Sequence, residues 1–250
     1  MAGTALTIVR IGTAGWALPK ALRNSQSASK PVLEQYAELF DAVEVNSSFY
    51  RPHRRSTYER WRGSVPGSFR FSLKLSRVIT HELGLDQSEG ETRSFMESAR
   101  GLGHKLAVIL VQLPPSHIFD GSIAAAFFEL LREETAAHIV CEARNPSWFG
   151  SDATAVLEAY RVARVTADPL PPGCEFAAQA DSHFTYLRLH GSPKMYYSGY
   201  STAYLQRVAT VARAAAQTWC IFDNTAAGAA WPDAATLQRL LAVSDASRRQ

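Results

Sequence analysis

The heptapeptide FTYLRLH at residues 184–190 decides the fold of this 250-residue chain. Side chains in a β-strand alternate between two faces, so Arg188 and His190 share one face while Leu187 and Leu189 share the other. An apolar face is what a strand needs where helices cover it, and in a closed barrel the polar face then points inward. The heptapeptide therefore predicts a strand whose carboxyl end carries polar groups toward a barrel mouth.

Seven further short apolar runs occur along the chain, at 7–13, 42–48, 69–75, 106–113, 138–144, 163–168 and 219–224. Helical patterns separate them, and such alternation is typical of parallel sheets. Eight strands in a chain of this length predict an α/β fold, an eight-stranded parallel (β/α)8 barrel of the TIM type. An open doubly wound sheet is the alternative that the same alternation leaves open.

The helices are predicted from amphipathic patterns at 31–40, 56–62, 88–102, 123–134, 153–160, 202–216 and 234–243. The sixth helix is expected to be short or missing, because the connection at 169–179 is rich in proline. We expect a single barrel domain over residues 1–243, followed by a polar, frayed tail at 244–250.

Composition narrows the class of protein. The formal net charge of +3 is too small to indicate a nucleic-acid partner, so we expect a small-molecule substrate instead. The three cysteines, Cys141, Cys174 and Cys220, have neither paired nor metal-ligand spacing, which favours a reducing compartment. No run approaches the roughly 20 apolar residues that span a bilayer. The N-terminus lacks the pattern of a signal peptide, and we expect a cytoplasmic protein without a membrane partner.

Polar residues gather at the carboxyl ends of the predicted strands, which is where parallel barrels carry their chemistry. Glu44, Glu142 and Asp168 are candidate catalytic carboxylates, and His190 is a candidate proton-transfer group near neutral pH. The alternative is that the carboxylates only form ion pairs with lysine and arginine inside the barrel.

Substrate-binding candidates come from the same strand ends and from the loops that follow them. Lysine and arginine could hold an anion, and aromatic rings could stack on a sugar or a base. The candidates are Asn46, Tyr50, Lys74, His81, Gln112, Arg144, Trp148, Arg188, Tyr196, Tyr200 and Asn224. Tyr196 and Tyr200 lie in a loop that could act as a lid.

Familiar cofactor and metal motifs do not occur in the sequence. We find no Walker loop, dinucleotide fingerprint, His-Glu-x-x-His or Gly-x-Ser-x-Gly. No cofactor is therefore predicted. One divalent metal ion held by Glu44, Glu142 and Asp168 stays open, because hard cations accept carboxylates and water.

Several separated segments resemble the YecE-like family, a family of domains of unknown function (number 72), from about residue 11 to residue 241. These segments are Gly12-Thr13-Ala14-Gly15-Trp16, Val43–Tyr50 with Thr57 and Trp61, Phe71 with Lys74, Ile79-Thr80-His81, Gln112-Leu113-Pro114-Pro115, Glu142 with Arg144, Ser147 and Trp148, Asp168, Tyr186–Gly191, and Tyr196 with Tyr200. The resemblance implies an eightfold barrel and no particular reaction.

The chain departs from the family pattern at four places. Ala14 stands where serine is usual, and Asn145 stands where histidine is common. Asp223 replaces the first asparagine of a usual pair and adds a carboxylate, and the glycine between the two tyrosines is at Gly199. A hydroxyl at position 14 and a titrating group at position 145 therefore cannot be essential here.

Three functions are compatible with these residues. The first is an enzyme doing acid–base, hydrolase-like chemistry on a small, polar, anionic substrate, phosphorylated or sugar-like. The second is a metal-dependent phosphodiesterase or nuclease, for which the arginines at 51–62 offer a basic surface. The third is a barrel that binds a ligand without catalysis.

Overall fold

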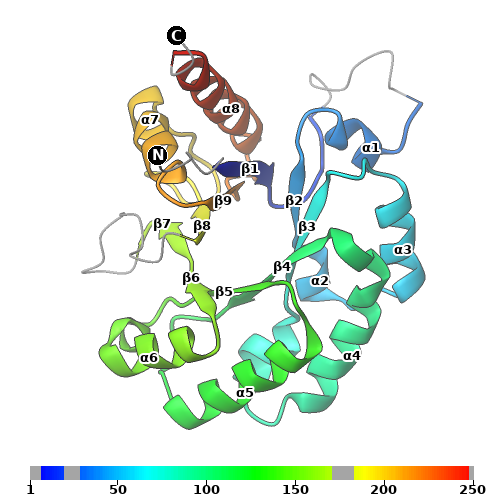
Figure 1. The fold of residues 1–250 in the computed structure, drawn as a ribbon, viewed down its shortest axis with the longest axis vertical. Helices are drawn as coiled ribbons and strands as arrows, with labels where there is room; N and C mark the ends of the chain where they lie inside the picture. The colour runs from blue at the N-terminus through cyan, green and yellow to red at the C-terminus, as the bar shows by residue number, and fades with distance from the viewer. Residues whose placement is uncertain (1–6, 20–28, 171–182, 248–250) are drawn as a thin grey trace, which may run out of the picture. The chain divides into compact units, whose positions relative to one another are not determined.

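The computed structural model describes residues 7–19, 29–170 and 183–247, which form an α/β fold with parallel strands (Figure 1). The strands are β1 (Ile8–Thr13), β2 (Ala42–Val45), β3 (Arg70–Lys74), β4 (Leu106–Gln112), β5 (His138–Glu142), β6 (Val162–Arg164), β7 (Thr166–Asp168), β8 (Phe184–Leu189) and β9 (Gln217–Phe222). The α-helices are α1 (Val32–Ala37), α2 (Ser47–Tyr50), α3 (Arg55–Gly63), α4 (Glu89–Ala99), α5 (Gly121–Glu134), α6 (Ser151–Ala159), α7 (Thr202–Ala212) and α8 (Ala230–Ser247).

Every predicted apolar run forms a strand, and each pairing between them is parallel. The sixth run is divided at Val165 into β6 and β7. The pairings give two sheets, with strand orders β1-β9-β8-β7 and β2-β3-β4-β5-β6. The prediction of a parallel α/β fold is thus confirmed.

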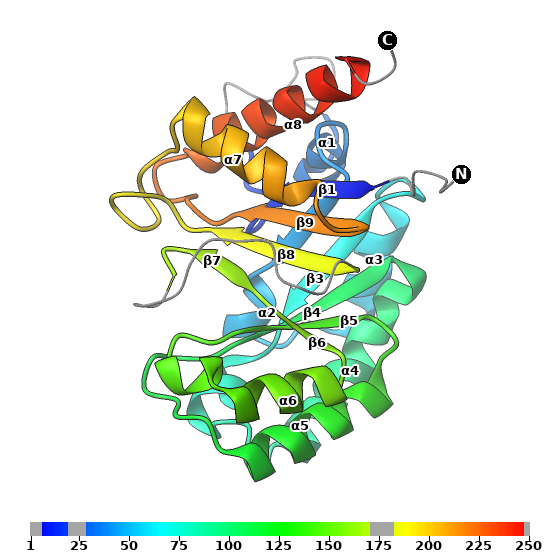
Figure 2. The same ribbon diagram turned by 60° about the vertical axis from the view of Figure 1, so that its left-hand side comes forward.

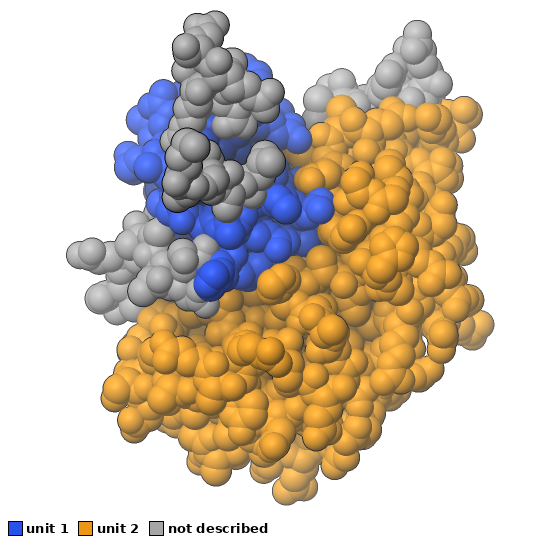
Figure 3. All heavy atoms as spheres, in the orientation of Figure 1, with its two compact units in different colours: residues 1–14, 166–170, 174–250 blue, residues 15–165, 171–173 orange. Residues whose placement is uncertain are grey.

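The chain divides into two compact units, coloured separately in Figure 3. Unit 1 comprises Met1–Ala14, Thr166–Leu170 and Cys174–Gln250, and unit 2 comprises Gly15–Val165 and Pro171–Gly173. The four-stranded sheet belongs to unit 1 and the five-stranded sheet to unit 2. The single domain over residues 1–243 stays a prediction.

In unit 1, α7 and α8 pack against each other and against the sheet (Figure 2). Leu187 of β8 and Cys220 of β9 are register partners, as are Leu189 and Phe222, so these apolar side chains share one face. The ring of Tyr200, just before α7, contacts Phe222 with centroids 6.4 Å apart. This face is therefore the one that the helices of unit 1 cover.

In unit 2, one face of the sheet is formed by large apolar side chains that are completely or almost completely buried. They are Val43, Val45, Phe71, Leu73, Ile109, Val111, Ile139 and Cys141. The chain places α3, α4, α5 and α6 along the outside of this sheet (Figure 1). Burying several such side chains, at roughly 1.5–3 kcal/mol each, gives unit 2 its core.

Helix boundaries differ from the sequence-based expectation at several points. Helix α8 begins at Ala230 and extends to Ser247, so part of the expected frayed tail is helical. Four short elements were not predicted: helix α2 at Ser47–Tyr50, where the apolar run was expected to continue as a strand to residue 48, a π-helix at Val78–Glu82, and 3₁₀ helices at Arg100–Lys105 and Pro146–Phe149. The expected sixth connection lies mostly outside the described residues. Among the residues described, no helix has the length and apolarity needed to cross a membrane.

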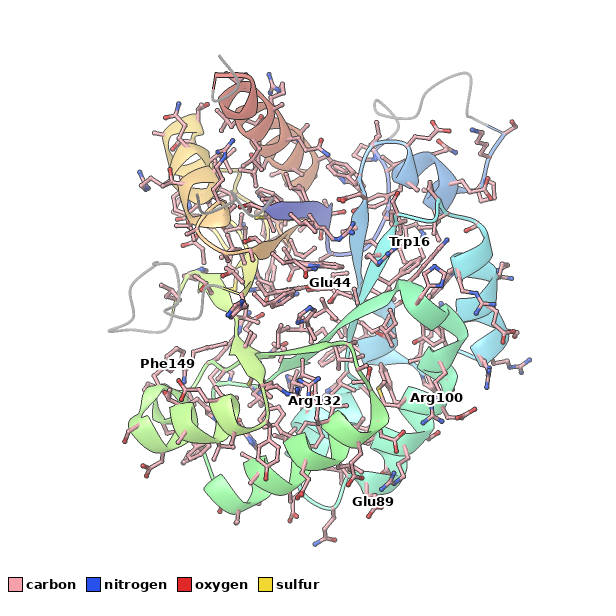
Figure 4. The ribbon with its side chains drawn as sticks, in the orientation of Figure 1. Trp16, Glu44, Glu89, Arg100, Arg132 and Phe149 are labelled. Atoms are coloured by element: carbon pink, nitrogen blue, oxygen red, sulfur yellow. The ribbon has the colours of Figure 1, made fainter. Side chains whose placement is uncertain are left out.

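A surface network of ion pairs ties α3, α4 and α5 together. Glu134 at the end of α5 has a side chain only 8% exposed and contacts Arg93 of α4 and Arg100 just after α4, the latter at 2.9 Å. Arg55 of α3 reaches Glu97 of α4 at 2.9 Å. Glu89 at the start of α4 and Arg100 just after its end are exposed (Figure 4). A nearly buried carboxylate with two arginine partners should matter more than an ordinary exposed pair.

Replacing Glu134 by glutamine should lower the free energy of unfolding by about 1 kcal/mol, because the substitution removes the charge that both arginines bond. The neighbouring Glu133 is the matched control, since its side chain is 62% exposed and 3.7 Å from Arg93. Glu133→Gln should change stability by less than about 0.5 kcal/mol. Urea unfolding measures both, and equal effects of the two substitutions would contradict the assigned role of Glu134.

Candidate functional site

The polar strand residues of unit 2 lie on the face of the sheet opposite its apolar face. Glu44 is the register partner of Ser72, Lys74 of Leu110, and Gln112 of Glu142. Partners in a parallel sheet point to the same side, and alternation places Ser72 with Lys74. Lys74, Gln112 and Glu142 are also the last residues of their strands. The predicted alternation therefore assembles a polar face at the carboxyl ends of β3, β4 and β5.

Glu142 and Arg144 form a buried ion pair at the end of β5. Oε1 of Glu142 accepts hydrogen bonds from Nη2 of Arg144 at 2.7 Å and from Nε at 3.0 Å. The carboxylate is 1% exposed and the arginine side chain 23% exposed. The Glu142 carboxylate is therefore shielded from solvent, whereas the Arg144 side chain remains in contact with it.

Lys74 and His81 pack on the same aromatic ring. Nζ of Lys74 lies 4.0 Å from the centroid of the Phe49 ring, and the His81 ring meets Phe49 edge-on at 5.0 Å. His81 belongs to the π-helix that follows β3, an element often found at functional sites. Burial lowers the pKa of His81, and so do the charges of nearby cations, Lys74 first.

Three other predicted residues of unit 2 lie on β2, just after it and at the end of β4. Glu44 is fully buried on β2, where its carbonyl accepts a hydrogen bond from Gly15 N at 2.7 Å (Figure 4). Asn46 precedes α2, and its Oδ1 is buried. The side-chain amide of Gln112 donates to the carbonyl of Leu113 at 2.8 Å.

The aromatic candidates of unit 2 behave differently from one another. Tyr50 is 79% exposed, whereas Trp148 is completely buried and donates from Nε1 to the carbonyl of His117 at 3.1 Å. Trp16 packs edge-on against Trp61 with centroids 4.9 Å apart (Figure 4). Trp148 and Trp16 therefore serve packing, and Tyr50 is the ring with an open surface.

In unit 1, Arg188, His190 and Asp223 form a buried polar cluster. Nη2 of Arg188 donates to Oδ2 of Asp223 at 2.9 Å, and Nδ1 of His190 lies 3.1 Å from the same oxygen without hydrogen-bond alignment. Nε2 of His190 is 3.4 Å from Nη1 of Arg188. A guanidinium only donates, so Nε2 accepts and the neutral imidazole carries its proton on Nδ1, toward Asp223.

Asp223 is the member of this cluster that was not among the predicted site residues. It follows Phe222 at the end of β9, beside β8 in the sheet. The signal was present, because Asp223 departs from the family's asparagine and lies near the end of the last apolar run, 219–224. A carboxylate added next to a buried arginine is the expected compensation for its charge.

Asp168 and His190 do not lie on the same face of the sheet. Asp168 is the register partner of Leu189, whereas Ala167 is the partner of Arg188, so Asp168 points to the helix side. There it interacts with the hydroxyls of Tyr200 and Tyr204, whose pKa values are raised first by burial. Asp168 was grouped with the inward carboxylates at the sequence level, and the register separates it from them.

The same helix-side face holds the loop between β8 and α7 in place. Backbone N–H of Gly191 donates to the Tyr200 hydroxyl at 2.7 Å. Nδ2 of Asn224 donates to Oδ2 of Asp233 at 2.8 Å, and that oxygen also accepts from Tyr200 N at 3.1 Å. Tyr196, 40% exposed, places its ring edge-on to His190 at 5.6 Å. Asn224 and Tyr200 thus position this loop, while Tyr196 covers the imidazole.

A metal site does not emerge from the part of the chain that the structure describes. Within it, no three side chains of histidine, cysteine, aspartate or glutamate gather closely enough to hold an ion. Cys141 and Cys220 are buried thiols, and burial raises the pKa of Cys141 to about 12. The two thiols are therefore protonated and unreactive at neutral pH.

Fold and site together define an α/β protein with parallel strands and polar groups at the strand ends. Residues 10–250 match the family described as "Protein of unknown function DUF72". The chain belongs to this family, which confirms the resemblance found in the sequence. The family description assigns no activity to its members.

Among relatives, the UPF0759 protein YunF of Bacillus subtilis (strain 168) is 30% identical over 150 residues, 57% of this chain and 52% of YunF. The UPF0759 protein YecE of Escherichia coli (strain K12) is 28% identical over 107 residues, 43% of this chain and 38% of YecE. The matches thus span about half or less of these relatives. A DUF72 family protein of Enterococcus faecalis V583 has a TM-score of 0.78 and 20% identity, covering 94% of this chain and 96% of that structure. It shows the shared fold.

Replacing Asp223 by alanine should cost about 3 kcal/mol or more, because it leaves the buried Arg188 charge without its carboxylate. The double variant Arg188→Met, Asp223→Leu should be less destabilised than Asp223→Ala, since it removes both charges. Urea unfolding of the single and double variants measures this coupling. Purely additive losses would show that the two side chains do not depend on each other.

Asp233 should make stability depend on pH. Burial raises its pKa above the value of 3.8 for a free carboxyl, so the folded protein binds the proton more tightly than the unfolded chain. The free energy of unfolding should therefore fall as pH rises from about 4 through the raised pKa. Asp233→Asn should lose this component while keeping an acceptor for Asn224. Parallel stability curves for parent and variant from about pH 4 to pH 7 would contradict the assignment.

Proposed function

We propose that this protein is an enzyme doing acid–base, hydrolase-like chemistry on a small, polar, anionic substrate. The observation that carries the proposal is the burial of ionisable groups at strand ends in both units. Glu142, Arg188 and His190 are each 1% exposed. Burying charges costs stability, and a fold with no use for them could replace them by apolar residues.

In unit 1, His190 is the group best suited to move a proton. Asp223 faces Nδ1 and stabilises the imidazolium that forms when Nε2 takes up a proton. Nε2 in turn lies next to Arg188, which disfavours that charge. The two neighbours therefore act on the imidazolium in opposite directions.

In unit 2, Glu142 is the carboxylate best placed for acid–base work. Its hydrogen bonds to Arg144 orient the group and favour its ionised form. Gln112, its partner on β4, adds an amide beside it. Asp168 is assigned no catalytic step here, because its two tyrosine partners give it a role in positioning the loop before α7.

We also propose that the strands belong to an eight-stranded (β/α)8 barrel. The support is topological: all pairings are parallel, β2 to β6 are paired in chain order, β7, β8 and β9 are paired in chain order, and the first strand pairs with the last, β1 with β9. In an open doubly wound sheet, the first and last strands do not neighbour each other. On this proposal β6 and β7 are the two halves of the sixth strand. A crystal structure with an open sheet edge at β2 would refute it.

Activity should be sought on a panel of phosphomonoesters, phosphodiesters and glycosides. His190→Asn and Glu142→Gln should each reduce kcat by about a hundredfold or more, which is the usual effect of removing a proton-transfer group. Glu129→Gln, an exposed substitution on α5, is the matched control and should leave kcat unchanged. Each assay is run with and without manganese or zinc.

Three results would contradict the proposal. Turnover that survives both substitutions would remove His190 and Glu142 from the chemistry. Cleavage of phosphodiesters only in the presence of metal would instead favour a metal-dependent nuclease. Tight binding of a compound from the panel without any turnover would favour a binding protein.

A further inference from the structure

Arg188 is poorly suited to hold the anionic group of a substrate. Its guanidinium is already bonded to Asp223 at 2.9 Å, and its side chain is 1% exposed. An anion in solution does not reach a side chain that is buried to this degree, whereas Arg144, which also bonds a buried carboxylate, is 23% exposed. The cation that receives the substrate must be sought among groups that solvent and solutes can reach.

Unit 2 brings two such cations together with two imidazoles, and we call these four side chains the unit 2 basic cluster: Lys74, Arg144, His81 and His117. Three neighbouring strands supply them, because Lys74 ends β3, His117 follows β4 and Arg144 follows β5. All four are partly exposed. Lys74 and His81 both contact the Phe49 ring. The ring of His117 packs against Gly84: its Cε1 and Nδ1 atoms lie 3.4 Å from the position that a Cβ on Gly84 would occupy.

The electrostatics of this cluster favour an anion beside His81. Burial is the first cause of the lowered pKa of His81, and the positive charges of Lys74, Arg77 and Arg144, with that of His117 when it is protonated, lower it further. At neutral pH the imidazole is therefore uncharged among cations. An oxyanion placed there would interact favourably with these charges and would allow the imidazole to accept a proton.

The hydrogen bonds of His81 indicate which ring nitrogen would take up a proton beside a bound oxyanion. The Thr80 hydroxyl donates its single proton to the carbonyl of Ser76 at 3.1 Å, so it accepts from Nδ1–H of His81 at 2.8 Å. Nε2 then carries the lone pair of the neutral ring. Proton uptake at Nε2 converts it into a donor, which a phosphate or carboxylate oxygen could accept.

We propose that Lys74, His81 and Arg144 form a subsite for an oxyanion group, phosphate or carboxylate, and that its occupation is coupled to proton uptake at Nε2 of His81. Lys74 contributes a point charge and Arg144 directional N–H donors. His117 borders the subsite from the β4 loop. The inference deepens the proposed function, because it names the part of the substrate that unit 2 holds.

The experiment is an NMR titration of the histidine side chains of the full chain, with and without inorganic phosphate, and in a parallel arm with malonate. Saturating anion should raise the pKa of His81 by at least about half a unit. His53 is the internal control, since it is also half-buried with a pKa lowered by burial, and it bonds Ser47 at 2.9 Å. Its pKa should not move.

Substitutions sharpen the same titration. Lys74→Met should weaken phosphate binding about tenfold, as expected for the loss of one charged contact. Lys194→Met, at an exposed lysine of unit 1 that lies over Tyr197, should leave binding unchanged. His81→Gln should remove the pH dependence of binding while the variant stays folded, as checked by circular dichroism.

Each outcome decides the assignment. A response to phosphate alone assigns a phosphorylated group, and a response to malonate alone assigns a carboxylate. No shift at His81, an equal shift at His53, or unchanged affinity in Lys74→Met overturns the subsite. Anion binding at His81 in a protein without turnover would support the subsite and refute the proposed enzymatic activity. Turnover without a pKa shift at His81 would support the enzymatic activity and refute the subsite.

Discussion

The alternation of side chains along parallel strands is the constraint on which this structure depends. Helices cover one face of each sheet, so that face must be apolar, and polar strand residues are left to the other. In unit 2 this places Glu44, Lys74, Gln112 and Glu142 on one face. In unit 1 it places Arg188 and Asp223 together. The site is thus a consequence of how the core is covered.

Alternation could be read from the sequence, and it predicted the strands and the polar face of unit 2 correctly. It could not decide the face of Asp168, because β7 has only three residues and its pairing with β8 sets the register. In the sequence, Asp223 could be recognised as a departure from the family pattern but not as a site residue. Its role depends on its contact with Arg188, which only the pairing of β8 with β9 reveals. The π-helix that carries His81 has no sequence signal that periodicity detects.

The two units use buried charge differently. In unit 1, the charge of Arg188 is matched by Asp223, and two hydrogen bonds hold the neighbouring loop, one from Gly191 N–H to the Tyr200 hydroxyl and one from Asn224 to Asp233. In unit 2, Arg144 is matched by Glu142 yet stays partly exposed, beside Lys74 and two imidazoles. The first arrangement suits a group whose orientation is held constant. The second suits a surface that receives a charged solute. Partly burying these charged groups lowers the stability of the fold, so function explains their presence better than stability does.

The most direct measurement is a crystal structure of the protein grown with inorganic phosphate at pH near 6, where His81 is more readily protonated. The account predicts an anion within about 3 Å of Nε2 of His81 and of the Arg144 guanidinium. Phosphate bound only to exposed arginines of α3, with the polar face of unit 2 empty, would contradict it.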